Sequence, residues 1–110
     1  MQSEAAVESF AALAHATRLN VFRTLLSAGP GGLSAGVLAE TLSVSPSNLS
    51  AHLAVLTRAG LVSARTHGRS RIYTVETARV AGLLEFLVSD CCNGRPEVCG
   101  PALAALSRAR

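Results

Sequence analysis

The sequence of 110 residues contains no tryptophan and no lysine, and aromatic residues make up only 4% of it. A core must therefore be built mainly from alanine, leucine and valine, a composition that favours packed helices over a large sheet. Nine glycines, four prolines and a charged fraction of 15% do not match a collagen-like or a disordered chain. A chain of this length is expected to form one domain with a substantial core.

Long hydrophobic runs are also missing. One of the longest apolar stretches, residues 80–88, is interrupted by Gly82 and Glu85 and falls well short of the roughly 20 residues that cross a bilayer. The first residues include Glu4 and Glu8 but no basic residue, unlike the start of a secretory signal peptide. These absences predict a cytoplasmic protein with no membrane partner.

Acidic residues are absent from positions 41–75, although this stretch contains four arginines and two histidines. An uncompensated basic stretch of this kind favours a polyanionic partner. The alternative is an ordinary solvated basic face. Arginine suits phosphate and guanine contacts, but a genomic composition bias explains the absence of lysine equally well.

Apolar residues recur every three to four positions and predict a mainly α-helical fold of about five to six helices. The expected helices span residues 3–14, with Ser3 as N-cap, then 16–28, 34–42, 45–60 and 77–89, with a short sixth helix at 102–109. The clearest start is Ser45 followed by Pro46, and Gly60 ends the same helix. Two short helices joined by a brief turn at residues 43–44 predict a helix-turn-helix.

Two strand-like segments, residues 61–64 and 72–75, flank a basic turn that contains Gly68. They predict a β-hairpin wing, so the expected fold is a winged helix-turn-helix. The final long helix carries an apolar stripe that we expect to face a second subunit in part, although closing the monomer core is the alternative. We divide the chain into a DNA-binding and dimerisation domain, residues 1–90, and a C-terminal effector tail, residues 91–110.

Several spaced motifs together resemble the ArsR/SmtB family of winged-helix repressors. They are HATRL at 15–19, LAETLSVSPSNLSAHL at 38–53, LTRAGLV at 56–62, and Gly68-Arg69 with Tyr73. The resemblance covers about residues 7–88. It implies a homodimer, joined through its first and last helices, that binds a palindromic operator and is released when a metal or metalloid binds.

The residues themselves also point to double-stranded DNA. A recognition helix needs a small, polar N-terminal surface to enter the major groove, and Ser45 at the helix start suits a phosphate. Arg69 and Arg71 on the wing are expected to contact the backbone or the minor groove. The expected DNA-binding residues are Ser45, Ser47, Asn48, Ser50, Ala51, His52, Arg69 and Arg71. For His52, a hydrogen bond inside the helix pair is an equal alternative.

Three cysteines, Cys91, Cys92 and Cys99, lie directly after the last long helix. Two effector sites of the resembled family lack their ligands here, because residues 37–42 contain no Cys, His or Asp and residues 77–89 contain no His. The tail resembles the arsenic-responsive repressors whose three ligands are C-terminal. Three thiolates suit the pyramidal coordination of trivalent arsenic or antimony, so we expect arsenite, or antimonite, as the inducer.

Other functions of the cysteines remain open at this point. Another thiophilic ion, a thiol redox sensor or a persulfide sensor would use the same residues, although Asp90 and the negative end of a helix disfavour a reactive thiolate. An enzyme is not expected, because the phosphate-binding Cys loop of a thiol phosphatase requires an arginine where Glu97 and Val98 stand, and no catalytic triad is present. A winged helix that binds only protein is a further alternative.

Overall fold

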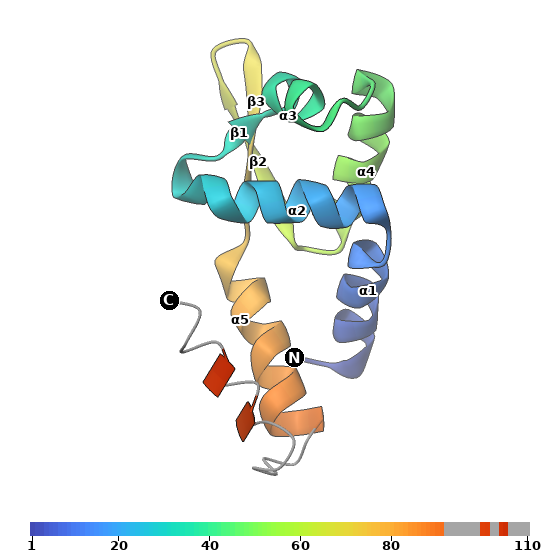
Figure 1. The fold of residues 1–110 in the computed structure, drawn as a ribbon, viewed down its shortest axis with the longest axis vertical. Coiled ribbons are helices and arrows are strands. Elements are labelled where there is room, and N and C mark those ends of the chain that lie inside the picture. The colour runs from blue at the N-terminus through green and yellow to red at the C-terminus, as the bar shows by residue number, and fades with distance from the viewer. Residues whose placement is uncertain (92–99, 102–103, 106–110) are drawn as a thin grey trace.

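The computed structural model describes residues 1–91, 100–101 and 104–105, with side chains described up to Val88 in the first range. The elements of the first range follow in chain order (Figure 1): α1 (Ser3–Leu13), α2 (Ala16–Ala28), η1 (Gly29–Gly31), β1 (Leu33–Ser34), α3 (Ala35–Leu42), α4 (Pro46–Arg58), β2 (Val62–His67), β3 (Ser70–Val75), α5 (Thr77–Glu85) and η2 (Phe86–Cys91). The predicted winged helix-turn-helix is confirmed.

Helix α1 differs from its sequence-based description in two respects. Gln2 rather than Ser3 is the N-cap residue, and no side chain caps the helix, so the predicted cap is wrong. The buried residues are Ala6, Ser9 and Ala12. The apolar residues whose spacing predicted the helix are Val7, Phe10, Leu13 and Ala14. Small residues allow close helix packing, and the Ser9 hydroxyl is satisfied because it donates to the Ala5 carbonyl oxygen at 2.9 Å.

The helix-turn-helix forms as its local sequence predicts. Ser34 caps α3 by accepting from Val37 N, and Ser45 caps α4 by accepting from Asn48 N at 3.3 Å. Between the helices, Ser43 adopts the left-handed conformation with φ of 53°. The buried Leu49, Leu53 and Leu56, which are at most 2% exposed, then hold α4 against the core.

The sheet has three strands in the order β1-β3-β2, all antiparallel. Both hairpin strands are longer than predicted, and β2 pairs with β3 from Val62↔Val75 to His67↔Ser70. The short strand β1 was not predicted from the sequence; its Leu33 pairs with Tyr73. Gly32 is required beside it, because a Cβ there would meet the Tyr73 carbonyl oxygen and lie 2.6 Å from Thr74 Cγ2.

The predicted last helix, residues 77–89, is α-helical only to Glu85 and continues as the π-helical segment η2 to Cys91. Only Leu83 of α5 is fully buried. The start of α5 is tied to the turn between α4 and β2, because Glu76 N donates to the Leu61 carbonyl oxygen at 2.8 Å. A Cβ on Gly60 would lie 2.7 Å from an Arg79 nitrogen, so the Arg79 guanidinium covers the turn that contains Gly60, between α4 and β2.

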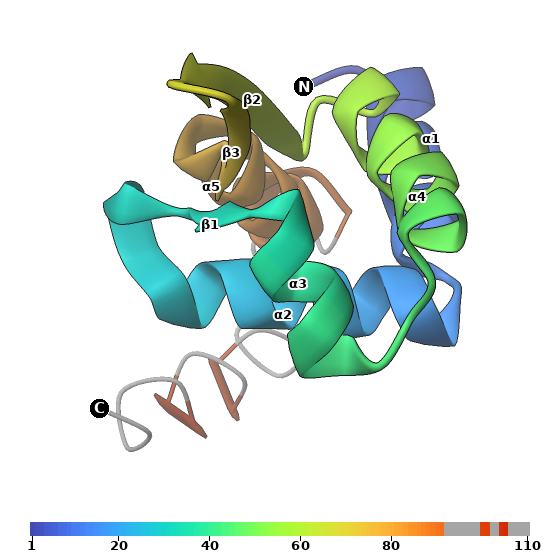
Figure 2. The ribbon, with the colours of Figure 1, turned by 90° about the horizontal axis from the view of Figure 1, so that it is seen from above.

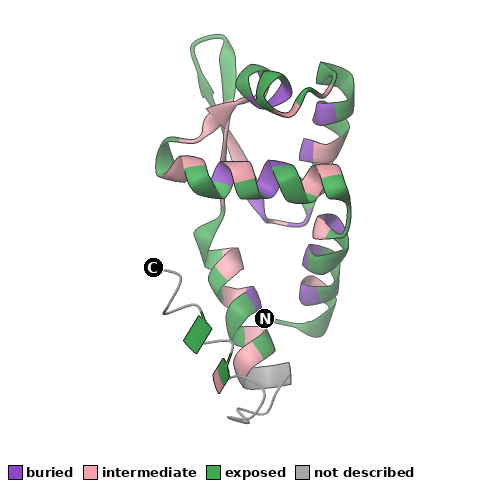
Figure 3. Cartoon of the chain, viewed as in Figure 1, coloured by how far each residue is buried: buried purple, intermediate pink, exposed green. Residues whose placement is uncertain are grey.

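Large apolar residues are exposed on α1, on α5 and in η2, and Figure 3 colours the exposed parts of the chain green. Val7 is 66% exposed and Leu84 is 50% exposed, and Phe10 and Leu87 are also exposed. The sixth helix predicted at residues 102–109 falls largely outside the described residues. Among the residues that the structure describes, no helix is both long enough and apolar enough to span a bilayer.

Candidate nucleic-acid interface

The first two turns of α4 present a small, polar surface. Ser47, Asn48, Ser50 and Ala51 are exposed, while the leucines of the same helix point into the core. The Ser45 hydroxyl is occupied by the cap, yet it remains at an exposed helix N-terminus. Such an end attracts a phosphate. The structure therefore places these five sequence-predicted residues together on one exposed end of α4.

His52 differs from the other predicted contact residues because it is half-buried beside α2. Arg18 Nη1 lies 3.4 Å from His52 Nδ1, and the ring centroids of His15 and His52 are 4.6 Å apart. Burial lowers the pKa of His52 below 6.5, and electrostatic interactions with His15 and Arg18 lower this pKa further. This contact joins α4 to α2 rather than to α3, so it is not the predicted hydrogen bond inside the helix-turn-helix pair.

Arg18 acts as the structural partner in this cluster. Its Nε donates to the Ala12 carbonyl oxygen at 2.6 Å, so the side chain joins the end of α1 to α4. The contact between Arg18 and His52 spans 34 positions of sequence. Helical periodicity carries no signal for so distant a pair, so sequence reasoning could not have found it.

The β2–β3 hairpin carries the two predicted wing arginines. Arg69 and Arg71 are exposed, and Gly68, with φ of 64°, makes the turn. Arg65 of the same basic stretch instead donates from Nη2 to the Gly31 carbonyl oxygen at 2.9 Å, which fixes the hairpin against η1. The view from above shows α4 and the hairpin on the same face of the molecule (Figure 2). Sequence-predicted contacts from two separate elements thus share one face.

The predicted effector residues lie at the limit of the described chain. The backbone of Cys91 ends η2, whereas its side chain, Cys92 and Cys99 lie outside the described residues. Within the described part of the chain, no three His, Cys, Asp or Glu residues are grouped so that they could hold a metal ion. The three-cysteine site therefore stays a prediction.

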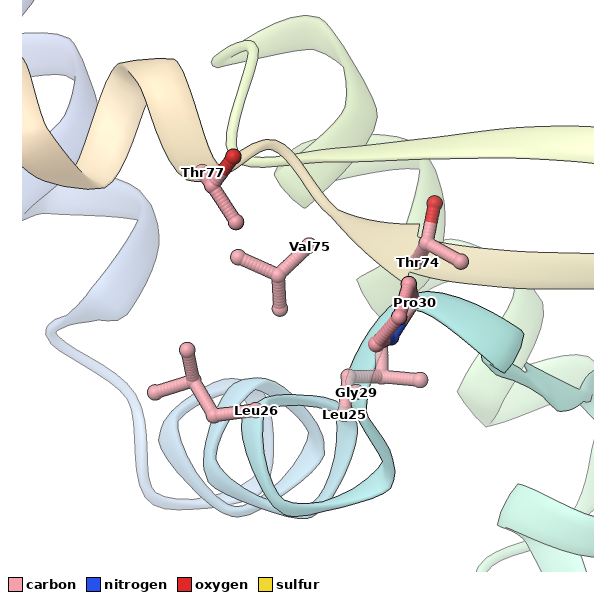
Figure 4. Close-up of a pocket in the computed structure, with 7 residues that line it drawn as sticks. All are labelled: Leu25, Leu26, Gly29, Pro30, Thr74, Val75 and Thr77. Carbon is pink, nitrogen blue, oxygen red and sulfur yellow. The ribbon is translucent and has the colours of Figure 1, made fainter.

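An apolar hollow of about 370 Å³ lies elsewhere, between the end of α2 and the junction of β3 with α5 (Figure 4). Its lining includes Leu25, Leu26, Pro30 and Val75, with threonine hydroxyls at the edge. No charged side chain lines it. This hollow therefore does not fit a metal ion or a phosphate.

Comparison with known proteins shows that the chain is similar to transcriptional regulators. A helix-turn-helix domain family matches residues 13–64. The transcriptional activator HlyU of Vibrio cholerae is 38% identical over 85 residues, which cover 77% of this chain and 76% of HlyU. The solved structure of HlyU has a TM-score of 0.66 at 35% identity and covers 84% of this chain and 99% of its own. HlyU has also been solved in a form described as reduced, with a TM-score of 0.64, 36% identity and coverage of 81% of this chain and 90% of that one.

Two other solved structures are similar over most of their length. An ArsR-like transcriptional regulator from Rhodococcus sp. RHA1 has a TM-score of 0.72 at 27% identity, covering 96% of this chain and 92% of its own. A possible transcriptional regulator for arsenical resistance has a TM-score of 0.65 at 34% identity, covering 74% of this chain and 82% of its own. These relatives are DNA-binding regulators, which confirms the prediction that the chain is not an enzyme. The chain belongs to the ArsR family of winged helix-turn-helix transcriptional regulators.

Proposed function

We propose that the protein is a homodimeric repressor that binds a palindromic operator and is released by trivalent arsenic, or antimony, bound at Cys91, Cys92 and Cys99. The observation that carries DNA recognition is the joint exposure of the polar first turns of α4 and the arginines of the wing on one face. In this arrangement α4 enters the major groove, and the wing contacts the backbone or minor groove.

The dimer is supported by the apolar surface of the described monomer. The exposed residues are Val7 and Phe10 on α1, Leu84 on α5 and Leu87 in η2. Their exposure is costly in water unless a partner covers them. Two copies related by a two-fold axis would present two recognition helices to two half-sites of one operator.

The effector assignment rests on the chemistry of the donor set. Three thiolates fill the three coordination directions of As(III), whose lone pair occupies the fourth, whereas structural zinc requires a fourth ligand. The relative described as a possible regulator for arsenical resistance is consistent with this choice. Binding expels the thiol protons, so no preformed thiolate is needed.

Thiol redox sensing, including persulfide formation, is the second candidate. It is favoured by the adjacent positions of Cys91 and Cys92 and by the existence of HlyU in a form described as reduced. Asp90 beside them disfavours a reactive thiolate, so we place this function second.

One experiment separates these candidates. The purified protein, bound to its own promoter fragment, is titrated in parallel with arsenite, zinc, cadmium and peroxide while DNA release is followed by fluorescence anisotropy. Arsenite should release DNA in the wild type, and the double variant Cys91→Ser with Cys92→Ser should bind DNA normally but resist arsenite. Release by peroxide alone, or a double variant that still responds to arsenite at wild-type concentrations, would overturn the arsenic assignment.

A further inference from the structure

A second hollow, of about 570 Å³, lies between α4 and the hairpin. We call it the α4–wing groove. One wall is formed by α4 and the other by β2 and β3; its lining is Ser50, Ala54, Thr57, Arg58, Ser63, Ala64, Arg71 and Tyr73. The α4 residues follow a spacing of four, three and one, which places them along one side of the helix.

The side chains of the α4–wing groove suit an anion. It contains two guanidinium groups, of Arg58 and Arg71, and the hydroxyl groups of Ser50 and Tyr73. The hydroxyls of Thr57 and Ser63 also line it, but they are hydrogen-bonded to the Leu53 carbonyl oxygen and to Thr74 Oγ1. No carboxylate lines the groove, and none occurs anywhere in residues 41–75. Both arginines are exposed, so each can turn toward a ligand. Guanidinium and hydroxyl donors without a competing carboxylate are typical of phosphate recognition.

The groove also joins the two parts of the proposed DNA-binding face. Ser50 is among the exposed residues in the early turns of α4, and Arg71 belongs to the wing. From Ser50 to Arg58 the helix rises by about 12 Å, at 1.5 Å per residue. One DNA strand carries a phosphate about every 3.4 Å of helix axis, so a wall of this length can face more than one phosphate.

We propose that the α4–wing groove seats the phosphodiester backbone of one operator strand and that Arg58 is a further positioning residue there. The inference rests on the proposed DNA-binding function and extends it to a residue at the far end of α4. Arg58 contacts phosphate rather than a base edge, so it contributes to affinity for every duplex and carries no sequence information.

The test compares Arg58→Ala with wild type on an operator duplex and on a random duplex over a series of KCl concentrations. We expect the Kd to rise by a similar factor, about tenfold, on both duplexes. The slope of log K against log salt should become shallower by about 0.9 for each phosphate that the variant no longer neutralises. Arg58→Lys should retain most of the slope. Arg23→Ala, an exposed arginine of α2 outside the groove, is the matched control and should leave both quantities unchanged.

The second readout is binding to an operator duplex in which neutral methylphosphonate linkages replace phosphates of the strand that lies in the α4–wing groove. They should weaken binding by the wild type but have little further effect on Arg58→Ala, because position 58 of this variant has no guanidinium to pair with the strand.

Two variants distinguish failure of this inference from failure of the proposed function. If Arg58→Ala has an unchanged salt slope while the double variant Arg69→Ala with Arg71→Ala binds DNA weakly, this inference is overturned and the proposed function stays intact. If both variants bind normally, the DNA-binding face itself is wrong. Competition by inorganic phosphate at constant ionic strength, with no effect of the methylphosphonates, would show a small-anion site and would likewise overturn the inference.

Discussion

At the level of single residues, the contact between Arg18 and His52 connects α4 to the α1–α2 junction, which is distant from it in sequence. Arg18 Nη1 can donate to His52 Nδ1 only while that nitrogen is unprotonated, and Arg18 Nε is already held by the Ala12 carbonyl oxygen. The charge state of His52 therefore affects how firmly α4 is held against the α1–α2 junction.

The lowered pKa of His52 makes stability depend on pH. The folded pKa lies below the unfolded value of 6.5, so the unfolded chain binds more protons and the free energy of unfolding should fall as the pH drops through about 6.5. Urea unfolding of His52→Gln between about pH 7.5 and 5.5 should show a smaller pH dependence than wild type. His67→Gln, at the exposed end of β2, is the control, and an equal pH dependence in wild type and His52→Gln would contradict the assignment.

Among the glycines that the structure describes, Gly32 is the one at which an added Cβ should destabilise the fold most. Its φ is 71°, and the new Cβ would collide with the backbone and side chains of β3. We expect Gly32→Ala to lower the free energy of unfolding by about 2 kcal/mol or more. Gly31→Ala is the control because a Cβ there has no atom within 4 Å. Equal stability of the two variants by urea unfolding would show that β1 can move away.

At the level of elements, the recognition helix depends on its first residue. Ser45 Oγ accepts from Asn48 N, so Ser45→Ala should lower the free energy of unfolding by about 1 kcal/mol. Ser47→Ala, two positions later and outside the cap, should change it little. Chemical unfolding monitored by circular dichroism measures both, and a neutral Ser45→Ala would mean that the turn residues alone hold the start of α4.

The elements that could be predicted from the sequence are those specified by nearby residues. The start of α4 follows from Ser45 and Pro46, and the inward leucines follow from helical spacing. Strand β1 has only two residues, and it forms because Leu33 meets Tyr73, forty positions away in sequence. The change from α-helix to π-helix at Phe86 likewise has no glycine or proline to mark it.

The sequence also did not reveal which side of α1 is buried. Its periodic apolar residues were identified, but the core takes Ala6, Ser9 and Ala12 instead. Periodicity shows that one side of a helix is apolar, whereas only the packing of the whole chain decides whether the chain itself or a partner covers that side.

For the candidate site, the sequence predicted a small, polar surface at the start of α4, and these residues are exposed. The partner of His52 could not be predicted in this way, because Arg18 is 34 positions away in sequence.

At the level of the whole molecule, the exposed apolar residues of α1 and α5 predict assembly. Leu84 on α5 is 50% exposed, and Leu87 in the following η2 is 40% exposed. Replacing both with glutamate should produce a monomer in sedimentation equilibrium and weaken operator binding strongly, because each half-site is then bound independently. Val37→Glu is the control; Val37 is similarly exposed on α3, away from α5. A double variant that remains dimeric would exclude this side of α5 and η2 from the interface.

The position of Cys91 has a consequence for the timing of gene control. Figure 1 shows α5 and η2 at the opposite end of the molecule from the wing and the helix-turn-helix. A ligand held there would leave the DNA-facing side chains unobstructed, so it can bind while the protein is still on the operator. The lifetime of the operator complex would then shorten as the ligand concentration rises, instead of being limited by spontaneous dissociation. A cell using such a switch could begin transcription within the time that the ligand takes to bind.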